Sequence, residues 1–120
     1  MTTTRPTVDI DALTRAIESR DADGVLAFYA DDATLTLVDR DHPPSAPTVL
    51  TGRDRIAGYY TDICGRNMDH QVHDAVATPD RLAYAQHCRY PDGTRVLCVT
   101  VATVRDGKIR TQTATQAWDS

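Results

Sequence analysis

Hydrophobic residues recur with two different periods along the chain, a helical one before residue 65 and an alternating one after it. A first helix is predicted from Asp9 to about Arg20, with an apolar stripe formed by Ile10, Leu13, Ala16 and Ile17. A break at 21–24 separates it from a short second helix over 25–29, which Asp31 and Asp32 are expected to close.

The middle of the chain combines one strand with one helix. Threonine and leucine alternate at 33–38, which predicts a strand, and residues 39–47 are expected to form a loop. Thr51 and Asp54 resemble a capping box at the start of a third helix, which Gly65 ends. The apolar stripe of this helix consists of Ile56, Tyr59, Tyr60 and Ile63.

Four segments after the third helix are rich in valine, threonine, tyrosine and alanine; they cover 69–77, 81–90, 94–104 and 108–118. The turn sequences TPD, PDG and RDG separate them, which predicts a four-stranded antiparallel meander. The predicted fold class is therefore α+β. Because a long sheet twists and the three N-terminal helices can cover one of its faces, we expect a cone-shaped sheet wrapped around the helices, with a small-molecule pocket between them.

Length and composition predict a single domain over 9–120 behind an N-terminal tail at 1–8. A net charge of −4 without a basic cluster argues against nucleic acid and anionic membranes as partners. The absence of an apolar leader or spanning stretch favours a cytoplasmic protein. The three cysteines, Cys64, Cys88 and Cys98, do not have metal-ligand spacing, so we expect free thiols and no metal site.

Three stretches, ADGVLAFYADDATL, TGRDRIAGYY and VRDGKIRTQTATQAWD, resemble in their order the nuclear transport factor two-like superfamily. Within it they resemble the SnoaL-like proteins, which are related to polyketide cyclases and ketosteroid isomerase. The resemblance runs from about Asp9 to Asp119 and implies the αβ cone, commonly as a dimer through the outer face of the sheet. It does not imply one function, because members include isomerases, dehydratases, cyclases, hydrolases and non-catalytic binding modules.

Comparison with ketosteroid isomerase implies that its catalytic positions are replaced. Leu37 stands where the isomerase has its general base, Leu13 where it has its oxyanion tyrosine, and Thr100 where it has a protonated aspartate. Gln112 and Ala114 stand where many SnoaL-like proteins carry a histidine and an aspartate. Because leucine neither accepts a proton nor donates a hydrogen bond, ketosteroid isomerase activity is not expected.

The turn lengths predict which side chains share a face. Three-residue PDG and RDG loops would place Tyr84 opposite Thr100 and Thr100 opposite Gln112 in one inward row, with Gln86 and Gln116 on the same face. A two-residue DG turn would reverse the last strand. The outer face, suited to solvent or a dimer partner, would then carry Ala83, Ala85, His87, Arg89, Thr111, Thr113 and Thr115.

A three-residue TPD turn would place His70 near Cys88 and Asp74 opposite Tyr84, both facing the cavity. A histidine titrates near neutrality and a carboxylate can orient it, so His70 and Asp74 form a candidate acid/base pair. With a two-residue turn His73 would face inward instead. An equally weighted interpretation is that both histidines lie on a half-exposed strand and neither has a chemical role.

These patterns support two hypotheses. The first is a cofactor-free isomerase, lyase, cyclase or hydrolase acting on a hydrophobic, oxygenated metabolite, in which His70 shuttles a proton and Asp74 orients it. The second is a non-catalytic ligand-binding or dimerisation module of the same fold. A homodimer is expected in either case. The candidate substrate-binding residues are Leu13, Leu37, Tyr60, Tyr84, Gln86, Thr100, Gln112 and Gln116.

Overall fold

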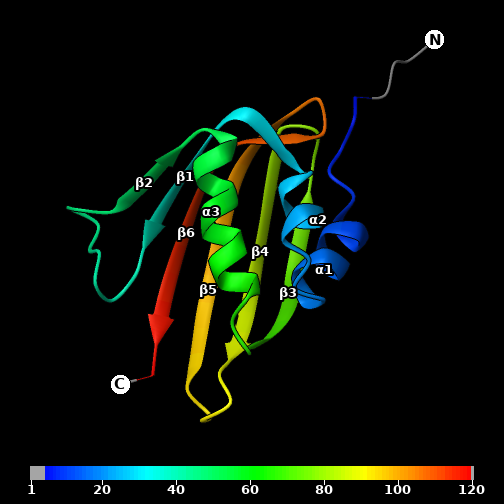
Figure 1. The fold of residues 1–120 in the computed structure, drawn as a ribbon. Coiled ribbons are helices and arrows are strands. Elements are labelled where there is room, and N and C mark those ends of the chain that lie inside the picture. The colour runs from blue at the N-terminus through cyan, green and yellow to red at the C-terminus, as the bar shows by residue number, and fades with distance from the viewer. Residues whose placement is uncertain (1–4, 120) are drawn as a thin grey trace.

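The computed structural model describes residues 5–119, in which three helices lie on one side of a six-stranded sheet (Figure 1). The helices are α1 (Ile10–Glu18), α2 (Ala22–Leu26) and α3 (Arg53–Cys64). The strands are β1 (Tyr29–Val38), β2 (Thr48–Thr51), β3 (Asp69–Ala77), β4 (Arg81–Arg89), β5 (Arg95–Arg105) and β6 (Lys108–Trp118). Residues 1–4 of the predicted tail, and residue 120 at the end of the predicted domain, lie outside the described part.

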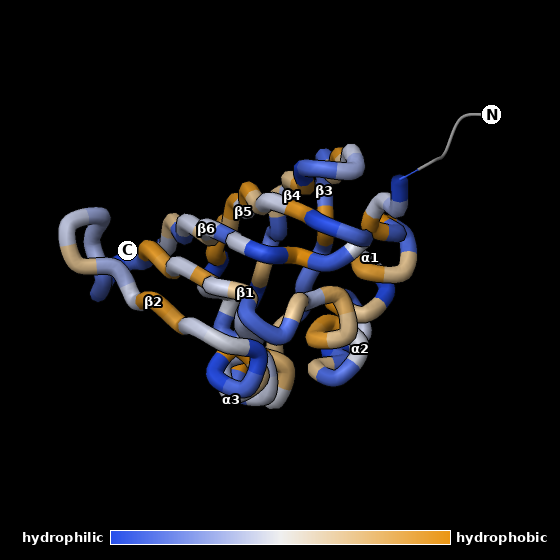
Figure 2. The backbone as a smooth tube through the Cα atoms, turned by 90° about the horizontal axis from the view of Figure 1, so that it is seen from above, coloured by the Kyte–Doolittle hydropathy of each residue, from blue (hydrophilic) through white to orange (hydrophobic). Residues whose placement is uncertain are grey.

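The sheet has the order β2-β1-β6-β5-β4-β3, so the first long strand lies beside the last one. β1 runs parallel to β6, and the other neighbouring strands are antiparallel. Figure 2 shows the sheet from above as an arc, with α2 and α3 on its hollow side. This arrangement is the curved α+β cone expected from the sequence.

The hydrophobic core fills the space between the hollow side of the sheet and the helices. Leu35, Ile56 and Ile109 from β1, α3 and β6 have no exposed surface, and Leu82 from β4 is 2% exposed. Burying each such side chain stabilises the fold by about 1.5–3 kcal/mol relative to leaving it exposed. These contacts hold α3 against the sheet, and α3 forms one wall of the cavity described below.

The predicted capping box of Thr51 and Asp54 at the start of α3 is wrong. Thr51 belongs to β2, where it pairs with Thr34, and the N-cap is Gly52. Gly52 has φ = 94° and makes no side-chain cap. Because a φ of this sign favours glycine, the chain can turn here directly from a strand into a helix.

The second helix begins three residues earlier than predicted, inside the expected break at 21–24: α2 covers Ala22–Leu26, and β1 already begins at Tyr29. Asp31 and Asp32 therefore do not close a helix; both are exposed on β1. Their carboxylates lie 3.8 Å from Arg53 and 3.3 Å from Arg110, respectively. These contacts agree with a structural role for the pair of acids.

The hairpin between β5 and β6 has a two-residue turn, Asp106 and Gly107, instead of the predicted three-residue loop. Both turn residues have positive φ, 54° and 74°. Three residues after Gly107, Arg110 bulges out of the ladder, which restores the predicted faces of β6. The predicted pairing of Thr100 with Gln112 is wrong by two residues, since Thr100 lies opposite Ala114 and Gln112 lies opposite Ala102.

A second bulge moves Asp74 out of the cavity. His70 pairs with Cys88 as predicted, but the pairing shifts between His73 and Val76, so that two residues of β3 oppose Tyr84. Asp74 lies in this bulge with φ = 56°, and its side chain is exposed. The prediction that Asp74 faces the cavity beside His70 is therefore wrong.

Candidate functional site

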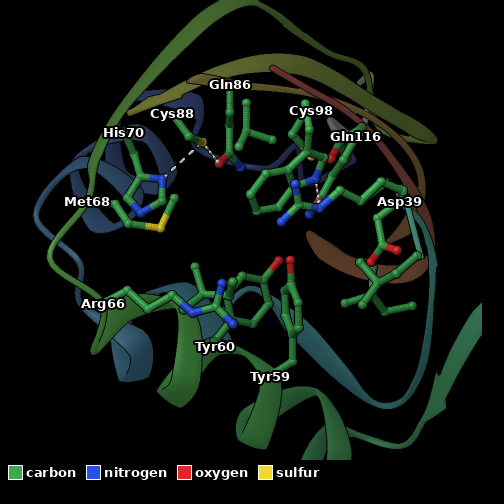
Figure 3. A pocket seen from close by; sticks show the side chains of 18 of the residues that line it. Asp39, Tyr59, Tyr60, Arg66, Met68, His70, Gln86, Cys88, Cys98 and Gln116 are labelled. Atoms are coloured by element: carbon green, nitrogen blue, oxygen red, sulfur yellow. Dashed lines mark hydrogen bonds between the residues drawn. The ribbon is translucent and has the colours of Figure 1, made fainter. Parts of the chain in front are cut away.

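A cavity of about 300 Å³ lies between α3 and the hollow face of the sheet (Figure 3). Its wall contains seven of the ten predicted site residues: Leu37, Tyr60, His70, Gln86, Thr100, Gln112 and Gln116. Two others, Leu13 and Tyr84, are buried in the core and do not line it. The inward face of the meander was therefore predicted correctly, although its register was not.

His70 lies on one side of the cavity in Figure 3 and is 7% exposed. Its Nδ1 lies 3.2 Å from Sγ of Cys88, and the Cys88 thiol in turn donates to Oε1 of Gln86 at 3.8 Å. Since this thiol proton points to Gln86, Nδ1 of His70 carries a proton and donates it to the sulfur. The series of hydrogen bonds from His70 through Cys88 to Gln86 thus leaves the lone pair of the imidazole on Nε2.

Nε2 of His70 is buried and has no hydrogen-bond partner among the described residues. Burial lowers the pKa of His70, and the nearby Arg20 acts in the same direction. The imidazole is therefore neutral near pH 7, and its basic nitrogen is not bound by any group of the described structure. Met68, a flexible side chain that also lines the cavity, lies next to the ring in Figure 3.

Tyr59 and Tyr60 extend from α3 and point their hydroxyl groups toward the centre of the cavity in Figure 3. The hydroxyl of Tyr60 lies 2.5 Å from that of Tyr29, which donates to Oε1 of Gln112. Because Tyr29 has one proton and Gln112 Oε1 can only accept, Tyr60 donates to Tyr29. The NH₂ group of Gln112 donates to the hydroxyl of Thr100 at 3.2 Å.

The tyrosines of the site stay protonated over the physiological pH range. Burial raises the pKa of Tyr29, Tyr59 and Tyr60 well above 10, and that of Tyr84 to about 12. The hydroxyl of Tyr59 has no hydrogen-bond partner within residues 5–119, in contrast to that of Tyr60. Tyr59 is therefore a free donor, which the sequence analysis treated only as part of an apolar stripe.

The two cysteines of the cavity are poor nucleophiles. Burial raises the pKa of Cys88 to about 11 and that of Cys98 to about 12, so both are thiols at neutral pH. Within residues 5–119, no three histidine, cysteine or acidic side chains gather closely enough to hold a metal ion. The arrangement can accept a proton at His70 and donate a hydrogen bond from Tyr59.

The helices of the described chain are all too short or too polar to span a membrane.

Residues 10–112 match the family model of the SnoaL-like domain. No curated protein matches the chain. Among solved structures, IdmH, a polyketide cyclase candidate from Streptomyces antibioticus, is 25% identical with a TM-score of 0.65, and the match covers 89% of this chain and 88% of IdmH. An NTF2-like protein of unknown function from Mesorhizobium loti is 15% identical with a TM-score of 0.75 over 92% of this chain and 88% of that one. A ketosteroid isomerase candidate from Kribbella flavida is 18% identical with a TM-score of 0.72 over 92% and 74%.

Proposed function

Because the chain belongs to the SnoaL-like domain family, we propose that it binds a small oxygenated metabolite in its cavity and acts on it by general acid/base catalysis. His70 serves as the base and Tyr59 as the hydrogen-bond donor to the substrate oxygen. The ligand has an apolar body, since Leu35, Leu37 and Ala114 form part of the wall. The likeness to IdmH supports a substrate with several carbonyl groups.

The observation that carries this proposal is the buried Nε2 of His70, which has no partner in the described structure. A buried polar atom without a partner costs about 1–3 kcal/mol, so a ligand that supplies the missing proton donor gains this energy. Cys88 and Gln86 hold the ring in the required tautomer, the role that the sequence analysis assigned to Asp74.

The reaction step that fits these groups is the removal of a proton from a carbon next to a carbonyl group. Nε2 of His70 takes the proton, the electron pair of the C–H bond forms a C=C bond, and the carbonyl oxygen becomes an enolate. The hydroxyl of Tyr59 stabilises this enolate by a hydrogen bond. Return of the proton to the same or another carbon completes an exchange or an isomerisation.

Deuterium exchange tests this step without knowledge of the natural substrate. With 2-tetralone in D₂O, the protein is expected to accelerate the incorporation of deuterium next to the carbonyl group, as followed by mass spectrometry. Tyr59→Phe should slow this exchange by about 10- to 100-fold, since it removes a hydrogen bond to the charged enolate oxygen. Binding of 2-tetralone without any acceleration would favour the alternative, a non-catalytic ligand-binding module. Isomerisation of a ketosteroid is not expected, because Leu37 stands where ketosteroid isomerase has its base and His70 lies on a different strand, β3.

We also propose that two copies pair through the outer face of the sheet. On β5 this face carries Leu97, Val99 and Val101, which are 41%, 46% and 57% exposed. Exposed apolar side chains that are contiguous on one face commonly mark an interface. An open hollow of about 530 Å³ lies at one end of the same face, lined in part by His87 and Leu97.

Sedimentation of a charged variant tests the homodimer. Val99→Glu is expected to shift the protein from dimer to monomer. The dissociation constant of the dimer should rise by at least about 100-fold, because a buried unpaired carboxylate costs several kcal/mol. Thr61→Glu is the control, since Thr61 is exposed on α3, which lies on the opposite side of the sheet from this face. A wild-type protein that sediments as a monomer at micromolar concentration would contradict the proposal.

We place the protein in the cytoplasm with small-molecule partners and no nucleic acid.

A further inference from the structure

At the mouth of the cavity lies a cation whose N–H groups bind no other group of residues 5–119. Arg40 follows β1 and lines the cavity, and its guanidinium group lies 4.2 Å from the centre of the Trp118 ring. Arg40 forms neither a hydrogen bond nor an ion pair with the rest of residues 5–119. Such a cation–π contact holds the guanidinium by its face and leaves its N–H groups free at the edge.

A second arginine lies on the other side of the same aromatic pair. Trp118 stacks on Tyr90 with ring centres 5.8 Å apart, and the hydroxyl of Tyr90 accepts a hydrogen bond from Arg66 at 2.8 Å. Arg66 also donates to Asp62 at 2.6 Å, so its charge is balanced. Arg40 is therefore the arginine of this group whose charge has no counterpart in the described structure.

The turn that carries Arg40 is held in one conformation by Asp39. Oδ1 of Asp39 accepts from the backbone N–H of Asp41 at 2.9 Å and lies 2.8 Å from Nδ1 of His42. Two backbone hydrogen bonds, of 3.1 and 3.2 Å, join Asp39 to His42 across the turn. Partial burial of Asp39 opposes ionisation, but the hydrogen bonds from His42 and Asp41 outweigh it and lower the pKa of Asp39.

Other free groups on the wall are also donors. Trp118 donates its indole N–H to Oε1 of Gln116 at 3.0 Å, and because an indole N–H can only donate, the NH₂ group of Gln116 faces away from it. This NH₂ group and the hydroxyl of Tyr59 have no acceptor among residues 5–119. A ligand that fits these groups must offer oxygen acceptors, and next to Arg40 it must offer a negative charge.

We infer that the ligand is an organic acid with an apolar body in the cavity and a carboxylate at the mouth, bound by the free N–H groups of Arg40. The inference rests on the proposed binding of a small molecule in this cavity and adds the charge of that molecule. Asp41 lines the same mouth and opposes the effect, since its carboxylate repels the ligand. Asp39, the other acid of the turn, also lines the cavity, but its Oδ1 is engaged by the backbone N–H of Asp41 and by His42 and not by Arg40.

Two probes of equal shape test the charge preference: 2-naphthoate and 2-naphthamide, with binding measured by calorimetry at low salt. The wild-type protein is expected to bind the naphthoate about 10-fold more tightly than the amide, since a hydrogen bond to a charged group is the stronger one. Arg40→Gln should bring this ratio close to one, and Asp41→Asn should raise it. Arg55→Gln, on the exposed side of α3, removes the same charge away from the cavity and should leave the ratio unchanged.

Equal binding of the two probes by the wild-type protein, or no binding of the naphthoate, would overturn the inference. An unchanged ratio in Arg40→Gln would also overturn it, because the charge would then be recognised elsewhere. A failure of the proposed catalysis is distinguishable: a wild-type protein that does not accelerate deuterium exchange but still prefers the naphthoate would refute the catalysis and leave charge recognition by Arg40 standing.

Discussion

Replacing Gln112 by methionine is expected to destabilise the protein by about 2–6 kcal/mol. Gln112 is 4% exposed, accepts the proton of Tyr29 and donates to Thr100. Methionine fills a similar volume, so the packing changes little, but both buried partners lose a hydrogen bond. Each unsatisfied buried group costs about 1–3 kcal/mol, which gives the expected sum. Urea unfolding followed through the fluorescence of Trp118, the single tryptophan, measures this difference.

Gln116→Met is the matched control on the same strand and the same face. Gln116 is only half-buried and accepts from Trp118, which water can reach, so the free energy of unfolding should change by less than about 1 kcal/mol. A Gln112→Met variant as stable as the wild type would mean that the hydrogen-bonded chain from Tyr60 to Thr100 contributes no net stability. The expected loss also concerns function, because this chain fixes the hydroxyl of Tyr60 at the cavity.

The faces of the strands were predictable from the sequence, whereas the register was not. Alternation along β4 to β6 placed Gln86, Thr100 and Gln112 inward, and all three line the cavity. Two bulges, one at Asp74 and one at Arg110, shifted the pairing. A bulge depends on local twist and on a residue that tolerates an unusual backbone conformation, which a pattern of hydrophobic residues does not encode.

The same limit explains why the sequence analysis missed Tyr59 and Arg40 as site residues. Tyr59 and Tyr60 are neighbours on a helix and point about 100° apart, so both reach the cavity only because the sheet curves around α3. The contact between Arg40 and Trp118 joins residues far apart in the sequence through the pairing of β1 with β6. This parallel pairing was not predicted, since the hairpin turns indicate neighbours along the chain only.

Replacing His70 by asparagine is expected to lower turnover by about 100- to 10,000-fold, the range for the loss of a general base. Asparagine can place its amide nitrogen close to the position of Nδ1 and keep the hydrogen bond to Cys88, but it has no basic atom at the position of Nε2. The fold should be retained, because Nε2 makes no hydrogen bond within the described structure. Deuterium exchange into 2-tetralone measures the loss.

The pH dependence separates a base from a residue that only shapes the cavity. Burial and Arg20 lower the pKa of His70, so the imidazole remains a base at pH values below its ordinary pKa of about 6.5. Exchange should therefore be independent of pH near neutrality and should fall in acid, at a pH below 6.5, as Nε2 takes a proton. His73→Asn is the control on the same strand, because His73 is exposed on the outer face and contacts His87. A variant at His70 that keeps both the rate and the acid limb of the wild type would remove this residue from the mechanism.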